Sequence, residues 1–280
     1  MKATYLARLF SVLTLSTAAL AASAAEAPIR LYVLDCGRIE FKDMAGFSDT
    51  GEYDGKAGKL VDTCYLIRHP KGTLLWDTGL GDKIAEQKQG VDNNGIHLNV
   101  DVTLQQQLKS LSLTPQDINY LAFSHFHFDH TGNANLFTSA TWILNSAELE
   151  GALAPKPTPA SDPSTISARE HAKTQMIDGD YDVFGDGSVK ILKAPGHTPG
   201  HQVLEVKLAK TGVVILGGDL YHTRENRKDR RVPAFNTSRA DTLASMDRIE
   251  RIVQNTHAKF IIQHNPEDVA ALPKLPGYLD

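Results

Sequence analysis

The sequence predicts a layered domain that mixes helices and strands, of the α/β or α+β class. Three observations support this prediction. Short apolar runs of strand length fall in two groups, one between residues 29 and 145 and one between residues 189 and 263. Segments with helical spacing accompany both groups. No internal repeat is visible among the 280 residues, so we expect one large domain.

The first group begins with an expected strand at 29–35 and a hairpin of strands 64–69 and 73–77, turned by Pro70-Lys71-Gly72. The glycine-rich stretch between them lacks a period and predicts a functional loop or lid over residues 37–60. The elements expected next are a helix at 102–111, a helical turn from Pro115, strands at 119–124 and 142–145, and a helix at 146–153.

The second group predicts strands at 189–193, 202–208, 213–216 and 259–263, with a helix at 240–254 whose apolar residues lie on one side. Clusters of polar residues follow directly after several of these expected strands. Because loops at strand ends are where a rigid scaffold positions chemistry, these clusters are the candidates for a functional site.

Composition excludes one class of partner. The chain is 41% hydrophobic and 22% charged, with a formal net charge of -4. Nucleic-acid binding needs a basic face, and a mildly acidic balance gives no reason to expect such a partner.

The first residues have the pattern of a secretory leader. Lys2 and Arg8 supply positive charge, residues 9–22 are apolar, and small residues follow. We therefore expect residues 1–25 to be a signal peptide and residues 26–280 to form the folded domain of the mature protein. The apolar run is too short to span a membrane, so the mature protein should be periplasmic or secreted, without a membrane partner.

Only two cysteines are present, Cys36 and Cys64. They could pair in an oxidising compartment. Both stand in apolar, strand-like stretches, however, which favours two buried free thiols.

The segment SHFHFDHTGN, residues 124–133, places four metal-ligand side chains within six positions: His125, His127, Asp129 and His130. Imidazole together with carboxylate suits zinc, iron or manganese better than calcium or magnesium. A polar turn with unrelated histidines is the alternative, and the density of the cluster speaks against it.

Three more side chains can complete a metal site, namely His197, Asp219 and His264, each close behind an apolar strand. Seven donors exceed what one four-coordinate ion uses. They suit two divalent ions that share a carboxylate, as in two-metal hydrolases. Spacing alone does not assign ligands to ions. Zinc is the metal that we favour, and iron, cobalt and manganese also fit.

These motifs resemble the signature of the metallo-β-lactamase superfamily, with all seven positions filled, and WDTG at 76–79 resembles that superfamily's first motif. The resemblance implies a four-layer αβ/βα sandwich. It also implies that His125, His127 and His197 hold one metal, that Asp129, His130 and His264 hold the other, that Asp219 bridges them and that Asp77 supports a ligand.

Within the superfamily, SHFHFDHTGN and the long stretch 177–204 look like the N-acyl-homoserine lactonases. This implies a quorum-quenching hydrolase that opens a lactone ring, with Asp129 passing a proton to the leaving group. Those lactonases commonly carry a substrate-binding tyrosine three residues after the bridging aspartate. Here that position is His222 and Tyr221 precedes it, so either residue is a candidate.

Several alternatives share this metal site. The main one is a phosphotriesterase-like or arylesterase-like hydrolase of other esters. A β-lactamase is disfavoured because those enzymes generally lack the aspartate corresponding to Asp219, and a non-catalytic protein is disfavoured because no ligand is lost. His201 is expected to be structural. Phe47 and Phe235 are candidates for an acyl-chain pocket, with packing in the core as the more common role of an isolated phenylalanine. The lactonase resemblance also makes a homodimer plausible.

Overall fold

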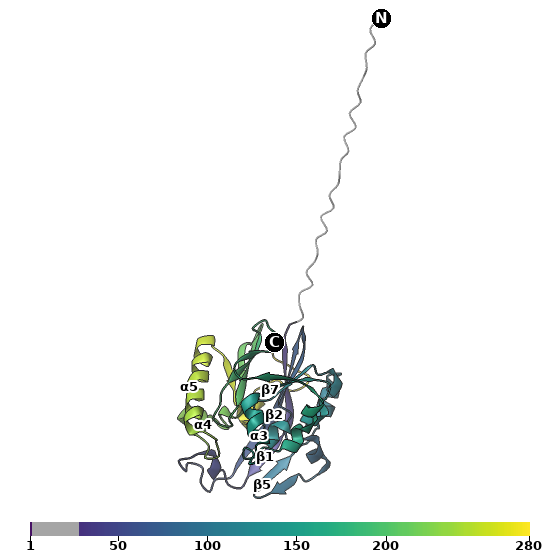
Figure 1. Cartoon of the computed structure of the whole chain (residues 1–280). Coiled ribbons are helices and arrows are strands. Elements are labelled where there is room, and N and C mark those ends of the chain that lie inside the picture. The colour runs from purple at the N-terminus through teal and green to yellow at the C-terminus, as the bar shows by residue number, and fades with distance from the viewer. Residues whose placement is uncertain (2–27) are drawn as a thin grey trace.

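Two β-sheets form the centre of the protein (Figure 1). The computed structural model describes residue 1 and residues 28–280, so the expected leader lies outside the described residues except for Met1. The larger sheet has the order β4-β5-β1-β2-β3-β6-β7-β8 and the smaller one β13-β12-β11-β10-β9. The strands are β1 (Arg30–Phe41), β2 (Gly58–His69), β3 (Gly72–Trp76), β4 (Val91–Asn93), β5 (Ile96–Asn99), β6 (Tyr120–Ala122), β7 (Thr141–Asn145), β8 (Lys173–Ile177), β9 (Tyr181–Asp182), β10 (Val189–Lys193), β11 (Gln202–Leu208), β12 (Gly212–Leu216) and β13 (Lys259–Ile261).

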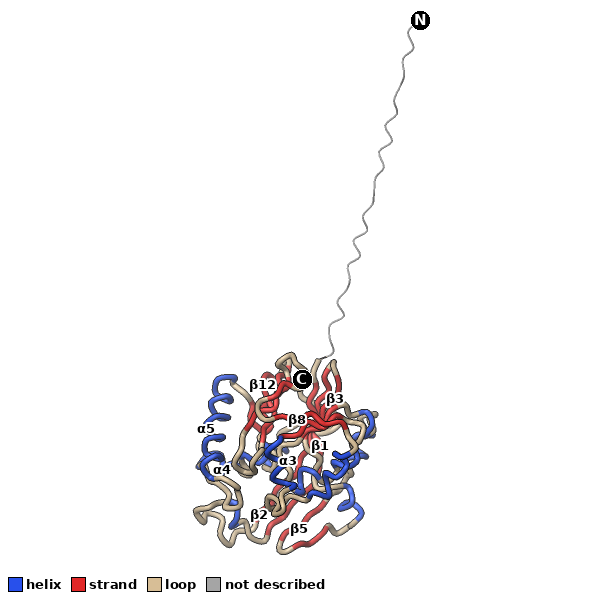
Figure 2. Tube along the Cα trace, viewed as in Figure 1, coloured by secondary structure: helices blue, strands red, loops and turns tan. Residues whose placement is uncertain are grey.

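Helices cover the outer faces of both sheets, as Figure 2 shows with α5 on one side of the strands and α3 on the other. The α-helices are α1 (Leu104–Ser110), α2 (Phe128–Thr131), α3 (Ser146–Leu153), α4 (Arg224–Asp229), α5 (Arg239–Thr256) and α6 (Pro266–Ala270). The 3-10 helices are η1 (Ala45–Phe47), η2 (Asp82–Glu86), η3 (Pro115–Asp117), η4 (Ala134–Leu136), η5 (Pro163–Glu170) and η6 (Gly218–Leu220).

Three apolar clusters separate four layers, which confirms the predicted sandwich. Trp76 and Leu204 belong to the cluster between the sheets. Trp142 packs with Leu108 of α1 on the outer face of the larger sheet, and the smaller sheet packs on α5 through residues such as Ile249. Because β2 is covered on both faces, residues 62–67 are buried without interruption, and the part CYLI at 64–67 is apolar at every position instead of alternating.

Strand direction places the carboxyl ends of several strands at the same edge of the sandwich. β3, β6, β7 and β8 run parallel in the larger sheet. In the smaller sheet β12 and β13 are parallel, and β10 runs the same way because both β10 and β12 are antiparallel to β11. The carboxyl ends of these strands therefore carry the loops that form the site.

The predicted loop 37–60 is shorter than expected. β1 continues to Phe41 and β2 begins at Gly58, so the connection spans residues 42–57 and contains η1. The reason is a bulge in β1, where the register with β2 shifts between Asp35 and Gly37. Gly37 has a φ of 140°, which glycine adopts readily, and the strand continues beyond it. Strands β4, β5, β8 and β9 were not predicted, because they are short and largely polar.

The prediction of two free thiols was wrong: Cys36 and Cys64 form a disulfide, with Cα atoms 5.9 Å apart. The sequence could not reveal that these residues lie across neighbouring antiparallel strands. Leu34 pairs with Cys64 in the register of β1 with β2, and the bulge brings Cys36 beside the same partner.

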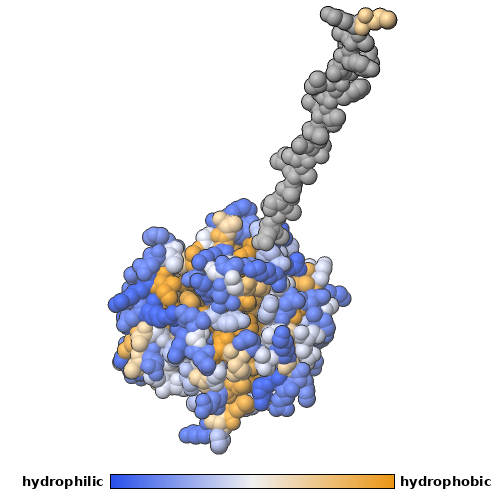
Figure 3. All heavy atoms as spheres, turned by 45° about the horizontal axis from the view of Figure 1, so that its top comes forward, coloured by the Kyte–Doolittle hydropathy of each residue, from blue (hydrophilic) through white to orange (hydrophobic). Residues whose placement is uncertain are grey.

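Hydrophilic residues predominate on the face shown in Figure 3, with smaller hydrophobic patches among them. Among the described residues, no helix has both the length and the apolar character needed to cross a bilayer.

Candidate metal centre

All seven predicted ligands converge at the edge where the strands end. His125 and His127 follow β6, and Asp129 and His130 lie on α2 directly after them. The other three follow strands of the smaller sheet: His197 comes after β10, Asp219 lies on η6 after β12, and His264 follows β13. All seven side chains are buried.

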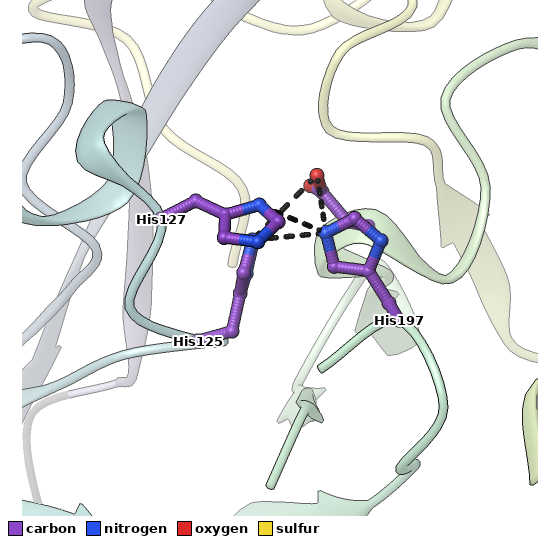
Figure 4. A group of neighbouring side chains, drawn as sticks. His125, His127 and His197 are labelled. Carbon is purple, nitrogen blue, oxygen red and sulfur yellow. Dashed lines mark hydrogen bonds and ion pairs between the residues drawn. The ribbon is translucent and has the colours of Figure 1, made fainter. Parts of the chain in front are cut away.

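The first group consists of His125, His127, His197 and Asp219. Nε2 of His197 lies 3.1 Å from Nε2 of His125 and 3.1 Å from Nδ1 of His127. Oδ2 of Asp219 lies 3.2 Å from Nε2 of His197 and 3.7 Å from Nε2 of His125. Figure 4 shows the rings of His125, His127 and His197 pointing toward one another and toward a carboxylate.

The second group consists of Asp129, His130 and His264, and it faces the other oxygen of Asp219. Nε2 of His130 lies 3.1 Å from Nε2 of His264. Oδ1 of Asp219 lies 3.2 Å from the first of these nitrogens and 2.9 Å from the second. Asp219 thus presents one oxygen to each group, as a bridging carboxylate would.

These distances fit tetrahedral zinc-like coordination. With metal–nitrogen distances of about 2.0–2.1 Å, the ligand atoms of a tetrahedral site lie about 3.3 Å apart. A second observation also fits: Oδ1 of Asp219 is buried without a well-aligned hydrogen-bond donor. A cation between the ligands would satisfy this oxygen.

The outward-facing ring nitrogens favour the tautomers that metal binding needs. The Nδ1–H of His197 donates to Oδ1 of Asn236 at 2.9 Å, and that of His264 donates to the carbonyl oxygen of Val61 at 2.8 Å. These bonds leave the lone pair of Nε2 directed into the site.

Electrostatics differ between the two groups. Burial holds the pKa of His125 and His127 well below the usual range, which keeps both rings neutral. At His264 burial also favours the neutral ring, but the Asp219 carboxylate outweighs it and raises the pKa to about 9. The pKa of His130 is raised for the same reason, with Asp77 contributing. Without metal, protons therefore balance the carboxylates in the second group.

Asp77 supports the second group through hydrogen bonds. It is fully buried and follows β3. Its Oδ1 accepts the backbone N–H of Ser124 at 2.6 Å, and its Oδ2 accepts the Nδ1–H of His130 at 3.0 Å and the amide of Gln263 at 2.7 Å. This is the supporting position that the resemblance implied.

His201 has the structural place expected for it. Its Nδ1–H donates to the carbonyl oxygen of Ala194, and its Nε2 accepts the backbone N–H of Asp219, both at 2.9 Å.

A largely apolar cavity of about 410 Å³ ends on the two groups. Its polar lining includes His127, Asp129, Asp219, His222 and His264, and its apolar lining includes Ile39, Phe41, Phe47, Leu60, Phe128 and Phe235. Phe47 and Phe235, the two candidates for an acyl-chain pocket, thus line this cavity. Another cavity, of about 520 Å³, lies between β1, β2, α1 and residues 266–275, and none of the seven ligands lines it.

The structure separates the two candidates for the substrate-binding residue. The Nε2–H of His222 donates to Oδ2 of Asp219 at 3.0 Å, and His222 lines the cavity. Tyr221 points the other way: its ring packs on Phe260, and its hydroxyl interacts with Glu250 of α5. The structure therefore does not bring Tyr221 to the site.

Residues 42–57 form one wall of this cavity and are held in place. The segment contributes Lys42, Asp43, Gly46 and Phe47 to the lining. Hydrogen bonds join it to residues 223–234: Asp49 N–H to Val232 O, Ala234 N–H to Gly46 O, Asn226 Nδ2 to Phe47 O, and Tyr53 Oη with Thr223 Oγ1. This agrees with a functional loop, whereas movement as a lid stays a prediction.

Sequence reasoning missed several residues that hold the ligands in place. Glu148 and Asn236 carry no motif that marks them, and both act through contacts distant in the sequence. The only local signal for Glu148 was its position in the first turn of the helix expected after the strand 142–145.

A four-layer sandwich with two His/Asp groups at one edge of its sheets defines a class of metal-dependent hydrolases. Residues 57–264 match the family model described as the metallo-beta-lactamase superfamily. The chain belongs to this superfamily.

Relatives in this superfamily include N-acyl homoserine lactonases. The chain is 30% identical over 262 residues to the N-acyl homoserine lactonase AttM of Azorhizobium caulinodans, covering 90% of this chain and 99% of that protein. It is 29% identical over 257 residues to the lactonase AiiA of Bacillus thuringiensis, covering 89% and 98%.

Solved structures agree with these relatives. An N-acyl homoserine lactone hydrolase with the product N-hexanoyl-L-homoserine bound at its catalytic metal centre is similar with a TM-score of 0.78 and 28% identity, covering 89% of this chain and 98% of that one. The dizinc quorum-quenching lactonase AidC, at 18% identity and a TM-score of 0.65, shares the fold.

Proposed function

We propose that this protein is a metal-dependent lactonase that opens the ring of N-acyl-homoserine lactones. The observation that carries the proposal is the shared Asp219, which joins two metal-binding groups at the end of an apolar cavity. The similarity to lactonases over nearly the whole chain supports it. The cavity volume falls within the about 300–1,000 Å³ of small-molecule sites.

Four residues of the chain would have distinct roles in the reaction. The apolar wall of Phe47 and Phe235 would hold the acyl chain. His222 would orient the lactone ring, because it stands beside Asp219 within the cavity. Asp129 lines the cavity and would deliver a proton to the alkoxide that leaves the carbonyl. When bound, the two metal ions supply a Lewis acid and a water of lowered pKa.

Zinc is the metal that we propose for both groups. Five imidazole and two carboxylate side chains form the donor set, and its spacing fits the short bonds of zinc. Iron, cobalt and manganese also accept such ligands, so availability contributes to which ion is held.

We also propose that the protein works in the periplasm or outside the cell. The leader-like pattern of residues 1–25 supports this location. The Cys36–Cys64 disulfide supports it independently, since disulfides persist in oxidising compartments. Assembly into a homodimer stays a prediction.

Proton release by the purified, metal-loaded protein tests the substrate assignment. We would supply N-acyl-homoserine lactones of several chain lengths and, beside them, a phosphotriester and a chromogenic cephalosporin. The proposal predicts fast acidification with the lactones that is lost in a His130→Ala variant. Turnover of the triester without turnover of any lactone would instead assign the protein to the ester-hydrolase alternative.

A further inference from the structure

Glu148 joins two loops that carry ligands of the first metal group. It lies on α3 and is 2% exposed. Its Oε1 accepts the backbone N–H of Phe126, the residue between His125 and His127, at 2.9 Å. Its Oε2 accepts the backbone N–H of Gly200 at 2.8 Å and the hydroxyl of Thr198 at 2.6 Å, both in the loop of His197.

We propose that Glu148 is a positioning residue that fixes the geometry of the first group, His125, His127, His197 and Asp219, and thereby determines how tightly that group holds its metal ion. The inference rests on the metal-binding part of the proposed function and is independent of the substrate.

The fold explains why Glu148 can reach both loops. β7 runs parallel to β6, so α3 begins at the same edge as the loop of His125. The loop of His197 belongs to the other sheet, between β10 and β11. It approaches α3 closely because residue 200 is glycine: a Cβ there would lie 2.5 Å from the backbone nitrogen of Glu148. One side chain therefore links the two sheets beside the site.

Three donors make this link specific for a carboxylate. A buried carboxylate without a cationic partner needs hydrogen bonds to be tolerated, and such charge-assisted bonds are short and strong. Among the described residues, no Lys, Arg or His side chain forms an ion pair with Glu148. Its three donors are all in the two ligand loops, so its charge is compensated only while both loops keep their positions.

The second metal group has a different support. Asp77 holds His130 and the backbone of Ser124, and Gln263 donates to the same carboxylate. No hydrogen bond joins Asp77 to the loop of His197 among the described residues. Loss of Glu148 should therefore weaken the first metal site selectively, whereas loss of Asp77 should weaken mainly the second, since His130 is the ligand that contacts Asp77 directly.

Glu148→Gln is the informative variant. It keeps the shape of the side chain, but an amide has one oxygen, so its NH₂ must face an N–H donor at either Phe126 or Gly200. We expect the fold to persist, because Gln202 also ties the two loops: its N–H donates to Ser124 O and its amide donates to Phe123 O, both at 2.9 Å. Glu150→Gln is the matched control, since Glu150 stands exposed on the same helix.

Full-length mature protein stripped with chelator and reloaded with Co²⁺ provides the test. Metal binding is measured by equilibrium dialysis against a competing chelator. Proton NMR of the cobalt-loaded protein then counts the imidazole N–H signals that bound cobalt shifts, one for each histidine that holds the ion. The first group has three histidines and the second has two. We expect wild type and Glu150→Gln to bind two ions tightly.

In Glu148→Gln, one ion should bind about 10–100-fold more weakly, since partners of metal ligands typically contribute that much to metal affinity. At limiting cobalt only the two ring signals of the second group should remain, and Asp77→Asn should give the converse pattern. Thr198→Val removes one of the three donors and should weaken binding of the same ion by a smaller factor. This variant tests the proposal if Glu148→Gln does not fold.

Equal loss of both ions, or two ions held as tightly as in wild type, would overturn the assignment of Glu148. Wild type that binds no cobalt would contradict the proposed metal-dependent function itself, which is a separate result.

Discussion

His222 stands where the lactonases that this chain resembles commonly carry a tyrosine. Its Nε2–H donates to the bridging Asp219, and its ring lies edge-on to Phe47 and Phe235, with centroids 5.0 and 5.6 Å away. The ring is therefore held by the metal group on one side and by the apolar wall on the other. A residue so placed can orient a substrate, whereas Tyr221 has its hydroxyl near α5.

The first prediction contrasts these two neighbours. His222→Phe should lower kcat/KM for a lactone by about 10–100-fold, which corresponds to one lost polar contact of about 1–3 kcal/mol. Tyr221→Phe should leave kcat/KM within about twofold, because it removes a hydroxyl outside the cavity. Steady-state kinetics on metal-loaded variants check this. The reverse order of effects would return the role to Tyr221.

The second prediction concerns Asp62 on β2. Its two carboxylate oxygens are buried without a hydrogen-bond donor, and burial raises its pKa to about 8, with the Asp129 charge adding to the effect. The unfolded chain ionises this group near 3.8, so the folded state binds more protons in between. Stability contributed by the protonated group is therefore lost as the pH rises.

Asp62→Asn, a neutral mimic of the protonated acid, should remove that loss. In chelator, the Tm of the variant relative to wild type should increase from about pH 5 to about pH 8. Thermal unfolding at both pH values measures it, with an exposed Asp54→Asn variant as the control. A Tm difference that does not change with pH would show that Asp62 is ionised in the folded protein.

At the residue scale, the sequence predicted the seven side chains that converge at the site and the support from Asp77, but not the support from Glu148 and Asn236. His125 to His130 form a dense cluster, and His197, Asp219 and His264 follow recognisable strands, so local pattern was enough. Glu148 and the orientation of Tyr221 depend on which loops meet in space. No short motif records that, because the contacts of Glu148 with Thr198 and Gly200 span about fifty residues of chain.

Among the elements, the paired strands β1 and β2 were predicted only in part from the sequence pattern. The apolar runs in the first half of β1 and the last half of β2 were identified, whereas the remaining halves, toward Phe41 and from Gly58, were assigned to a loop. Those ends are polar or contain glycine, and pairing in the sheet decides their structure. The short strand β8, exposed along most of its length, was missed for the same reason.

The third prediction tests the disulfide that joins these two strands. Cys36 and Cys64 are 28 positions apart, and closing a loop of that size should stabilise the fold by about 3 kcal/mol. Reduction should lower the Tm by about 5–10 °C in a protein of this size. Thermal unfolding with and without reductant measures it. A Cys36→Ala/Cys64→Ala variant should show no response, and an unchanged wild-type Tm after thiol release would refute the estimate.

For the whole molecule, the metal site connects the two halves of the sandwich. His125, His127, Asp129 and His130 belong to the larger sheet's loops, whereas His197, Asp219 and His264 follow strands of the smaller sheet. Each group draws on both sheets, the first directly through His197 and the second through His264. The four-layer architecture was predictable from the family resemblance, whereas the two groups of apolar runs alone indicated only a layered domain of helices and strands.

The fourth prediction follows from this arrangement. Metal bound to the folded chain and not to the unfolded chain stabilises by about 2.7 kcal/mol per ion at a free concentration 100 times Kd. Chelation should therefore lower the Tm by several degrees, and zinc should restore it. An Asp219→Ala variant should respond much less, since it lacks the carboxylate common to both groups. Equal melting curves with and without metal would contradict the view that the ions join the sheets.

The measurement that tests the central claim most directly is mass spectrometry of N-hexanoyl-homoserine lactone incubated with the protein in three states: metal-loaded, chelator-stripped and reloaded. We predict conversion to the ring-opened N-hexanoyl-homoserine, larger by one water, in the first and third states and only the spontaneous background in the second. Ring opening at full rate in the stripped protein would contradict a metal-dependent lactonase.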